Sequence, residues 1–329
     1  MTKLEIPPDS PGRLTGADVA CAAQLACLLE VSAPKPGNVS PGHNFADLRY
    51  EDFLASAAAI GEPLAGAGSR GIGATVRLAV ESTARWARSN TNLGIILLLT
   101  PLACAAEKGD GSHFPTRSPG AVVPADDRLK MRPVPFSLRE AVRRVLEATT
   151  VDDARDVYAA IRRANPGGLG RAAAQDVANE PTRPLLEVMR LAADRDGIAR
   201  EYATAFETTF GTGVPALERA RSAGLSWDDA IVETFLTLLA AAPDTHVARR
   251  GGTSLAADIS RRARIALKAG GVRSDAGRRA LNELDCGLRD AHNTGNPGTT
   301  ADLTAAALFV VLINGGWHTP DGGHDAATR

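Results

Sequence analysis

The chain has 329 residues and a mass of 34.3 kDa, and 44% of its residues are hydrophobic and 23% are charged. This composition is typical of a folded globular protein and excludes a largely disordered one. The 37 Lys and Arg balance the 38 Asp and Glu to a net charge of -1, which argues against a nucleic-acid partner. The longest apolar run, 93–106, contains Pro101 and is shorter than the roughly 18 residues of a membrane span, so we expect no membrane partner.

The N-terminal residues and the cysteines indicate the compartment. Residues 1–13 are polar and rich in proline, without the apolar region of a secretory signal. No two of the cysteines form a C-x-x-C pair, which argues against disulfide scaffolds and zinc ribbons; they are Cys21, Cys27, Cys104 and Cys286. We therefore expect a cytoplasmic protein with reduced thiols. The sequence specifies no oligomeric state.

Helical periodicity dominates the chain. Aromatic residues make up only 4%, the long segments are rich in Ala, Leu and Arg, and this composition favours helices over strands. Apolar residues between 72 and 86 recur at spacings of three and four, which places them on one helix face. We therefore predict an all-α fold, a single compact domain of about 11–13 helices. In chain order the predicted helices are Ala17–Val31, Glu51–Leu64, Gly73–Arg88, Asn92–Glu107, Leu138–Ala148, Asp152–Ala164, Pro184–Asp194, Gly197–Phe210, Pro215–Ser222, Trp227–Ala242, Ser254–Ala269, Asp275–Ala291 and Thr300–Ile313.

The segments outside these helices set the expected boundaries. We expect residues 1–14 to be a flexible N-terminal segment, 15–318 an all-helical catalytic domain and 319–329 a flexible tail. Residues 108–135 contain many Gly and Pro and little periodicity, which predicts a long exposed loop between two helical halves of the domain.

Three helices carry further signals. Thr150–Asp153 and Ser226–Asp229 each have the spacing of a capping box before an apolar periodic run. The segment 92–107 is apolar on every side, which predicts a central buried helix.

One glycine pattern imitates a dinucleotide-binding motif. Gly66–Gly73 matches G-x-G-x-x-G, but that motif requires a preceding strand and an acidic residue about 20 positions later. Here the preceding segment, Phe53–Ile60, is an alanine-rich helix former, and no acidic residue lies among 91–100. We interpret the glycines as a hinge between two helices.

Two polar segments in the first third of the chain supply candidate residues. Lys35 lies in Pro34–Asn38, where two prolines stiffen the loop and Gly37 allows close approach of a ligand. It suits a phosphate, although a simple helix stop explains the same residues. Asn90 and Asn92 precede the apolar helix and either cap it or help to bind an anion.

Two more polar segments lie in the last third of the chain. Asp244, His246 and an arginine pair, Arg249 and Arg250, fall within seven residues. Arginine pairs suit phosphates, and an imidazole suits proton transfer. A Gly-rich segment at 165–170, by contrast, is interpreted as an ordinary loop.

The last polar segment precedes the C-terminal helix. Thr299 is a candidate N-cap with Asp302 three residues later, and capping explains that pair without a function. Asp302 is equally suited to hold a divalent cation on a triphosphate, because hard cations prefer carboxylate oxygen.

Three motifs in this order resemble the triphosphoribosyl-dephospho-coenzyme A synthase family. They are Pro34-Lys-Pro-Gly37, Asn90-Thr-Asn-Leu-Gly94 and Asn296-Pro-Gly-Thr-Thr-Ala-Asp302, and the similarity runs from about Ala22 to Ile313. The resemblance implies an all-α fold. It also implies transfer of the triphosphoribosyl group of ATP to the ribose hydroxyl of dephospho-coenzyme A, with release of adenine.

The chain departs from the well-described branch of that family. Asn92 and Leu93 stand where that branch has His and Lys. The sequence looks more like a sub-branch of archaea and one-carbon-metabolising bacteria. This leaves open an enzyme of one-carbon cofactor biosynthesis, of the methanopterin or methanofuran type, that acts on a phosphorylated precursor. A second alternative is a non-catalytic helical nucleotide-binding protein.

The chemistry implied by the resemblance determines the roles. Adenine leaves the anomeric carbon through an oxocarbenium-like state, which requires cations on the triphosphate, Mg²⁺ with ATP as co-substrate, and a general base. We assign the catalytic role to Asp244, His246 and Asn92. We assign phosphate or substrate binding to Lys35, Asn38, Asn90, Arg249, Arg250 and Asn296, and metal binding to Asp47, Asp302 and Glu81. The expected partners are a small-molecule nucleotide and a cofactor precursor, and one shared cavity should hold these side chains.

Overall fold

The chain is helical throughout the part that the structure describes. A computed structural model describes residues 14–87, 89–108, 136–290 and 292–317. Within these ranges there is no β-strand, and the single strand-like pairing is the bridge between Ser40 and His43. The all-α prediction is confirmed. No helix in the described ranges is long and apolar enough to cross a membrane.

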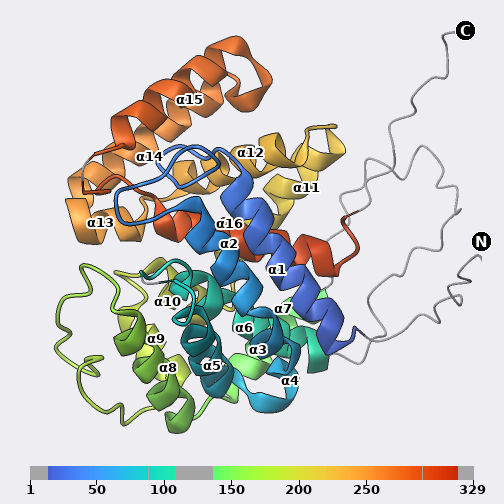
Figure 1. Cartoon of the computed structure of the whole chain (residues 1–329), viewed down its shortest axis with the longest axis vertical. Coiled ribbons are helices and arrows are strands. Elements are labelled where there is room, and N and C mark those ends of the chain that lie inside the picture. The colour runs from blue at the N-terminus through green and yellow to red at the C-terminus, as the bar shows by residue number, and fades with distance from the viewer. Residues whose placement is uncertain (1–13, 88, 109–135, 291, 318–329) are drawn as a thin grey trace, which may run out of the picture.

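The helices are numbered α1–α16 along the chain (Figure 1). A π-helical turn, Thr209–Gly213, and a 3₁₀ turn, Gly271–Arg273, lie between them. The α-helices are α1 Gly16–Ser32, α2 Tyr50–Ala59, α3 Gly61–Ala65, α4 Ala67–Arg70, α5 Ile72–Thr83, α6 Leu93–Lys108, α7 Phe136–Glu147, α8 Val151–Ala164, α9 Leu185–Ala192, α10 Gly197–Thr204, α11 Val214–Ser222, α12 Trp227–Ala241, α13 Thr245–Gly251, α14 Thr253–Lys268, α15 Asp275–Leu288 and α16 Gly298–Ile313.

The described residues hold more helices than the predicted 11–13 because one predicted helix is split in two and short helices form in segments outside the predicted ones. The predicted helix Glu51–Leu64 is divided into α2 and α3, the glycine-rich stretch 66–73 contains α4, and α13 occupies a polar segment outside the predicted helices. Gly71 and Gly252 both have a φ of +88°, a left-handed conformation that glycine adopts without strain. These glycines end α4 and α13 and allow the next helix to start in a new direction. The segments predicted as flexible or looped at 1–13, 109–135 and 319–329 lie outside the described residues.

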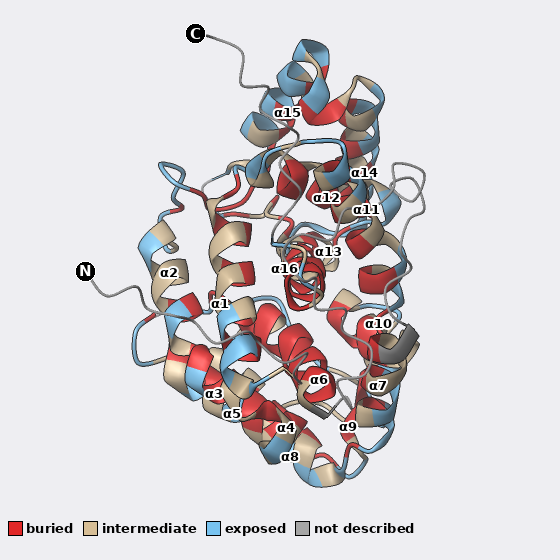
Figure 2. Ribbon diagram, turned by 90° about the vertical axis from the view of Figure 1, so that its right-hand side faces the viewer, coloured by how far each residue is buried: buried red, intermediate tan, exposed pale blue. Residues whose placement is uncertain are grey.

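The centre of the molecule is formed by α6 and α16. Both are largely buried, and the other helices surround them (Figure 2). The same cluster of buried apolar side chains also includes residues of α1 and α12. The predicted central burial of the segment 92–107 is confirmed, and its apolar character on all sides is the physical reason.

A proline inside α6 has a specific partner. Pro101 lacks the N–H that would bond to the carbonyl of Leu97 four residues earlier. The hydroxyl of Tyr202 donates to that carbonyl oxygen at 2.7 Å, and the Tyr202 side chain is buried. Helix α10 thus satisfies the acceptor that the proline leaves open in α6.

The predicted capping signals are confirmed where the structure describes them. Thr150 accepts from the backbone N–H of Asp153, whose carboxylate accepts from the N–H of Thr150. Ser226 accepts from the N–H of Asp229 at the start of α12.

Candidate functional site

The loop between α1 and α2, residues 33–49, lies against the segment that precedes α16 (Figure 1). The amide of Asn38 donates to the side-chain oxygen of Asn296 at 2.7 Å, across 258 positions of the chain. The amide of Asn293 donates to the carboxylate of Asp47 at 2.8 Å, across 246 positions. The first and the last of the polar segments are therefore in direct contact.

Helix α15 fixes the backbone of this loop. The N–H of Gly37 donates to the carboxylate of Asp285 at 2.7 Å. The guanidinium of Arg289 lies 2.8 Å from the same carboxylate and donates to the backbone carbonyl of Asn38 at 3.0 Å. Gly37 has a φ of +73°, and a Cβ there would lie 2.8 Å from the side chain of Leu288, so only glycine fits. Asp285 and Arg289 were not among the predicted site residues; their i, i+4 spacing was the available signal.

Lys35 does not extend into solvent. Its ammonium group is buried and lies 3.0 Å from the carboxylate of Glu30, and it also donates to the carbonyls of Glu30 and Ala33. Burial raises the pKa of Glu30, and the positive charge of Lys35 opposes that rise. Because a lysine has three N–H donors, phosphate binding by Lys35 would require one of these bonds to break.

Asp244 joins the starts of two helices. One carboxylate oxygen accepts from the N–H of Val247 and caps α13. The other accepts from the N–H and the hydroxyl of Thr300, both at 2.7 Å, in the first turn of α16. The predicted N-cap at Thr299 is wrong: α16 begins at Gly298, and its first turn is capped by Asp244, the residue before α13. Because both of its oxygens accept hydrogen bonds from the protein, the Asp244 carboxylate holds the start of α16 in place and is poorly suited to accept a proton from a substrate.

Asp302 lies at the contact between α16 and α6. A Cβ built on Gly94 would be 2.0 Å from its carboxylate oxygen, so the carboxylate packs against the first turn of α6. Burial raises the pKa of Asp302 well above its usual range, Glu30 and Asp244 raise it further, and Arg249 lowers it. Asp302 accepts no hydrogen bond from the described residues, which leaves its oxygens available to a ligand.

The arginines and histidine of α13 have distinct surroundings. Arg249 pairs with Asp196 at 2.7 Å, and Arg250 donates to the carbonyl of His292. The imidazole of His246 packs against Gly298 at the start of α16, and its Nε2 is buried without a hydrogen-bond partner in the described ranges. Burial, together with the two arginines, lowers the pKa of His246 to about 4, so the imidazole is neutral at pH 7.

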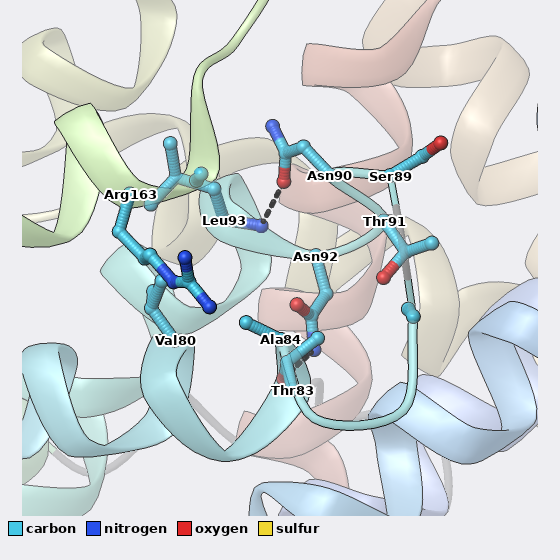
Figure 3. Close-up of a pocket in the computed structure, with 11 residues that line it drawn as sticks. Val80, Thr83, Ala84, Ser89, Asn90, Thr91, Asn92, Leu93 and Arg163 are labelled. Atoms are coloured by element: carbon cyan, nitrogen blue, oxygen red, sulfur yellow. Dashed lines mark hydrogen bonds between the residues drawn. The ribbon is translucent and has the colours of Figure 1, made fainter.

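The loop before α6 borders a pocket (Figure 3). The side-chain oxygen of Asn90 accepts from the N–H of Leu93 at 3.0 Å and caps α6, as one of the two interpretations predicted. The amide of Asn92 is buried and donates weakly to Thr83 at 3.4 Å. The hydroxyl of Ser89 donates to the backbone carbonyl of Asp47 at 3.2 Å, so this loop also contacts the loop between α1 and α2.

The two other predicted metal ligands lie at the surface. The carboxylate of Asp47 is exposed and is held by Asn293. Glu81, on α5, is about half exposed and pairs with Arg77 at 3.0 Å, and no contact in the described ranges joins it to the other candidates. The metal role of both residues stays a prediction. Among the residues that the structure describes, no three His, Cys, Asp or Glu side chains form a metal-binding group.

Polar residues from both ends of the chain thus gather around the first turns of α6 and α16. Asp302 and Gly94 join these turns to each other, Asp244 joins α13 to α16, and the 33–49 loop covers the segment before α16. Cations, amides and a carboxylate free of hydrogen bonds lie close together here. This set suits a phosphorylated, polar substrate.

Residues 16–320 match the family described as CitG: ATP:dephospho-CoA triphosphoribosyl transferase. The chain belongs to this transferase family. The match includes all the helices described above, and it bears out the resemblance that the three sequence motifs indicated.

Curated relatives of this transferase family match over a shorter stretch. A protein of Pseudomonas putida, named as a probable 2-(5''-triphosphoribosyl)-3'-dephosphocoenzyme-A synthase, is 42% identical over 115 residues, or 35% of this chain and 40% of that protein. A protein of Azotobacter vinelandii with the same name is 36% identical over 114 residues, or 35% of this chain and 38% of its own length. The chain thus matches about two fifths of the length of these relatives.

A solved structure supports the transferase fold over most of the chain. The crystal structure from Archaeoglobus fulgidus, provisionally named as a triphosphoribosyl-dephospho-coA synthase, is 27% identical to this chain with a TM-score of 0.54. The alignment covers 80% of this chain and 99% of that one. The helical scaffold is therefore shared with a family member along nearly the whole of the solved chain.

Proposed function

We propose that this transferase moves the triphosphoribosyl group of ATP to the ribose hydroxyl of dephospho-coenzyme A and releases adenine. The observation that carries the proposal is the gathering of the three family motifs around the first turns of α6 and α16, with the Asp302 carboxylate between them. The bond from the anomeric carbon to adenine breaks, and a bond from that carbon to the acceptor oxygen forms. The acceptor's proton is lost, and the departing adenine takes up a proton.

The residues present fit a Mg²⁺ ion shared with phosphates. Mg²⁺ is commonly held by one or two carboxylates together with substrate phosphates, and Asp302 is free of hydrogen bonds to the described residues, with Glu30 nearby. Such an ion would neutralise phosphate charge when bound. Burial and the neighbouring carboxylates raise the pKa of Asp302, and a bound cation would lower it again, because an adjacent positive charge favours the ionised carboxylate.

His246 is the better of the two predicted bases. Asp244 uses both oxygens to hold helix starts, whereas His246 keeps an unpartnered Nε2. A group with a pKa of about 4 resembles the carboxylates that assist oxocarbenium-like reactions in glycosidases. In this proposal His246 accepts the proton of the acceptor hydroxyl, and Asp244 positions the start of α16.

The remaining assignments follow from position. Arg249 lies close enough to Asp302 to lower its pKa, and we assign Arg249 and Arg250 to the phosphates. Asn38 and Asn296 hold each other and line the acceptor side in this proposal. The reduced cysteines of the described ranges form no disulfide, which supports a cytoplasmic setting.

The direct test is incubation of the purified protein with ATP and dephospho-coenzyme A, with and without Mg²⁺. Adenine is measured by chromatography, and the acceptor product by its gain in mass. We expect adenine and product in equal amounts, and Asp302→Asn should reduce both while the melting temperature changes by only a few degrees.

Two other results would replace the proposal. Adenine release only with a pterin or furan precursor as acceptor would favour the one-carbon cofactor alternative. Nucleotide binding without turnover of any acceptor would favour the non-catalytic alternative.

A further inference from the structure

The pocket beside the loop 89–93 combines apolar walls with hydroxyl, amide and guanidinium groups. Its cavity volume is about 50 Å³, and it is partly open to solvent. This is room for a few water-sized groups, the size of a phosphate subsite rather than of a pocket for a whole substrate. Apolar residues of α5 form one wall, the loop before α6 forms a second, and the end of α8 supplies Arg163 and Ala164. Figure 3 shows the Arg163 side chain extending beside Asn92 and Ala84.

The exposed side chain of Arg163 has no partner among the described residues. It forms no hydrogen bond or ion pair with the described residues. Its neighbour Arg162 bonds to the carbonyl of Val177 and pairs with Glu180. Both arginines lie in the last turn of α8, where any basic residue is favourable. The difference is that Arg163 lines the pocket and Arg162 does not.

The charge of the pocket favours an anion. None of its lining residues is acidic, and the remaining polar groups are the hydroxyls and amides of Thr83 and the loop 89–92. The nearby carboxylates of Glu81 and Asp156 are both engaged by Arg77. The amide nitrogen of Asn90 is free of described partners, because only its oxygen is used in the helix cap.

The pocket is also next to the candidate site. Leu93 lines it, and the following residue, Gly94, is in contact with the Asp302 carboxylate. Two consecutive residues of α6, whose Cα atoms are about 3.8 Å apart, therefore connect the two places. A chain of phosphates is the kind of ligand that can extend from one to the other.

We infer that Arg163 and the amide of Asn90 form a phosphate subsite, which binds the terminal phosphates of the triphosphate whose ribose end lies at Asp302. The guanidinium offers paired donors to phosphate oxygens, and the apolar wall of α5 limits competing water. This inference rests on the proposed function for the identity of the substrate. The subsite itself rests on the pocket and on the unpaired guanidinium.

The test uses inorganic tripolyphosphate as a probe, because it lacks both ribose and adenine. Calorimetric titration of the full-length protein is compared with Arg163→Gln, Arg163→Lys and the matched control Arg162→Gln. We expect at least tenfold weaker tripolyphosphate binding in Arg163→Gln, a smaller loss in Arg163→Lys, and unchanged binding in Arg162→Gln. The KM for ATP should rise in Arg163→Gln with a smaller change in kcat.

The outcomes separate the two proposals. Tripolyphosphate binding that depends on Arg163, in a protein that releases no adenine, supports the subsite and refutes the transferase proposal. Equal binding by the wild type and Arg163→Gln, or no binding by the folded wild type, overturns the subsite even if adenine is released.

Discussion

Replacing Gly94 with alanine separates the role of Asp302 in the reaction from any role in folding. The new Cβ would lie 2.0 Å from a carboxylate oxygen of Asp302 and 2.5 Å from its Cγ. Normal contacts between such atoms are about 3.5 Å, so the carboxylate must retreat by about 1 Å or more.

Gly94→Ala is expected to change the stability of the protein little and the rate of adenine release strongly. Alanine is favoured over glycine in a helix by about 1 kcal/mol, which offsets the local rearrangement, so the melting temperature should change by only a few degrees. A displacement of about 1 Å in a catalytic group costs about 100-fold in rate. We therefore expect adenine release from ATP to fall about 100-fold in Gly94→Ala.

The control is Gly211→Ala, because a Cβ at Gly211 would have nothing within 4 Å. Adenine release is measured at saturating ATP, and unfolding is followed by circular dichroism. A folded Gly94→Ala variant with wild-type activity would refute the placement of Asp302 in the site. Loss of the folded state in this variant would show that the contact between α6 and α16 is structural.

Three further predictions concern stability, and each is measured by denaturant unfolding. Tyr202→Phe leaves the Leu97 carbonyl without its donor and should cost about 1–3 kcal/mol; an unchanged midpoint would contradict the role given to Tyr202. The pKa of His246 is about 4 in the folded state, below the ordinary 6.5. The unfolded chain therefore takes up the proton first as the pH falls, so the contribution of His246 to the free energy of unfolding is complete above pH 6.5 and is lost towards pH 4. The loss is up to about 3 kcal/mol. His246→Gln should reduce the dependence of the free energy of unfolding on pH between 6.5 and 4, and an unchanged dependence would show that another group causes it. Lys35→Ala leaves Glu30 buried and unpaired and should cost about 3–5 kcal/mol; wild-type stability would argue against the pair.

The helices could be predicted from sequence because periodicity and capping act locally. The segment 92–107 was recognised as central because all its faces are apolar, and the start of α8 because its capping box lies within four residues. The start of α16 was misplaced because its cap, Asp244, comes from 56 positions away along the chain. No local pattern contains such a partner.

The site was predicted in composition but only partly in geometry. Asp302 was predicted as a metal ligand because hard cations prefer carboxylate oxygen. The burial of Lys35 depends on the fold of the loop after α1, which the prolines suggested but did not specify. Arg163 was not recognised because a basic residue in the last turn of a helix has an ordinary explanation.

The contacts between Asn38 and Asn296 and between Gly37 and Asp285 have a consequence for the time at which the protein becomes active. They join positions 258 and 248 residues apart. At about 5–20 residues per second, a ribosome needs roughly 10–50 s to add that length. During this time α1 can pack while the loop 33–49 remains hydrated and without its partner. We therefore expect nascent chains that end before α15 to have helical structure and no substrate binding, so that activity arises only after the segment that precedes α16 has been synthesised.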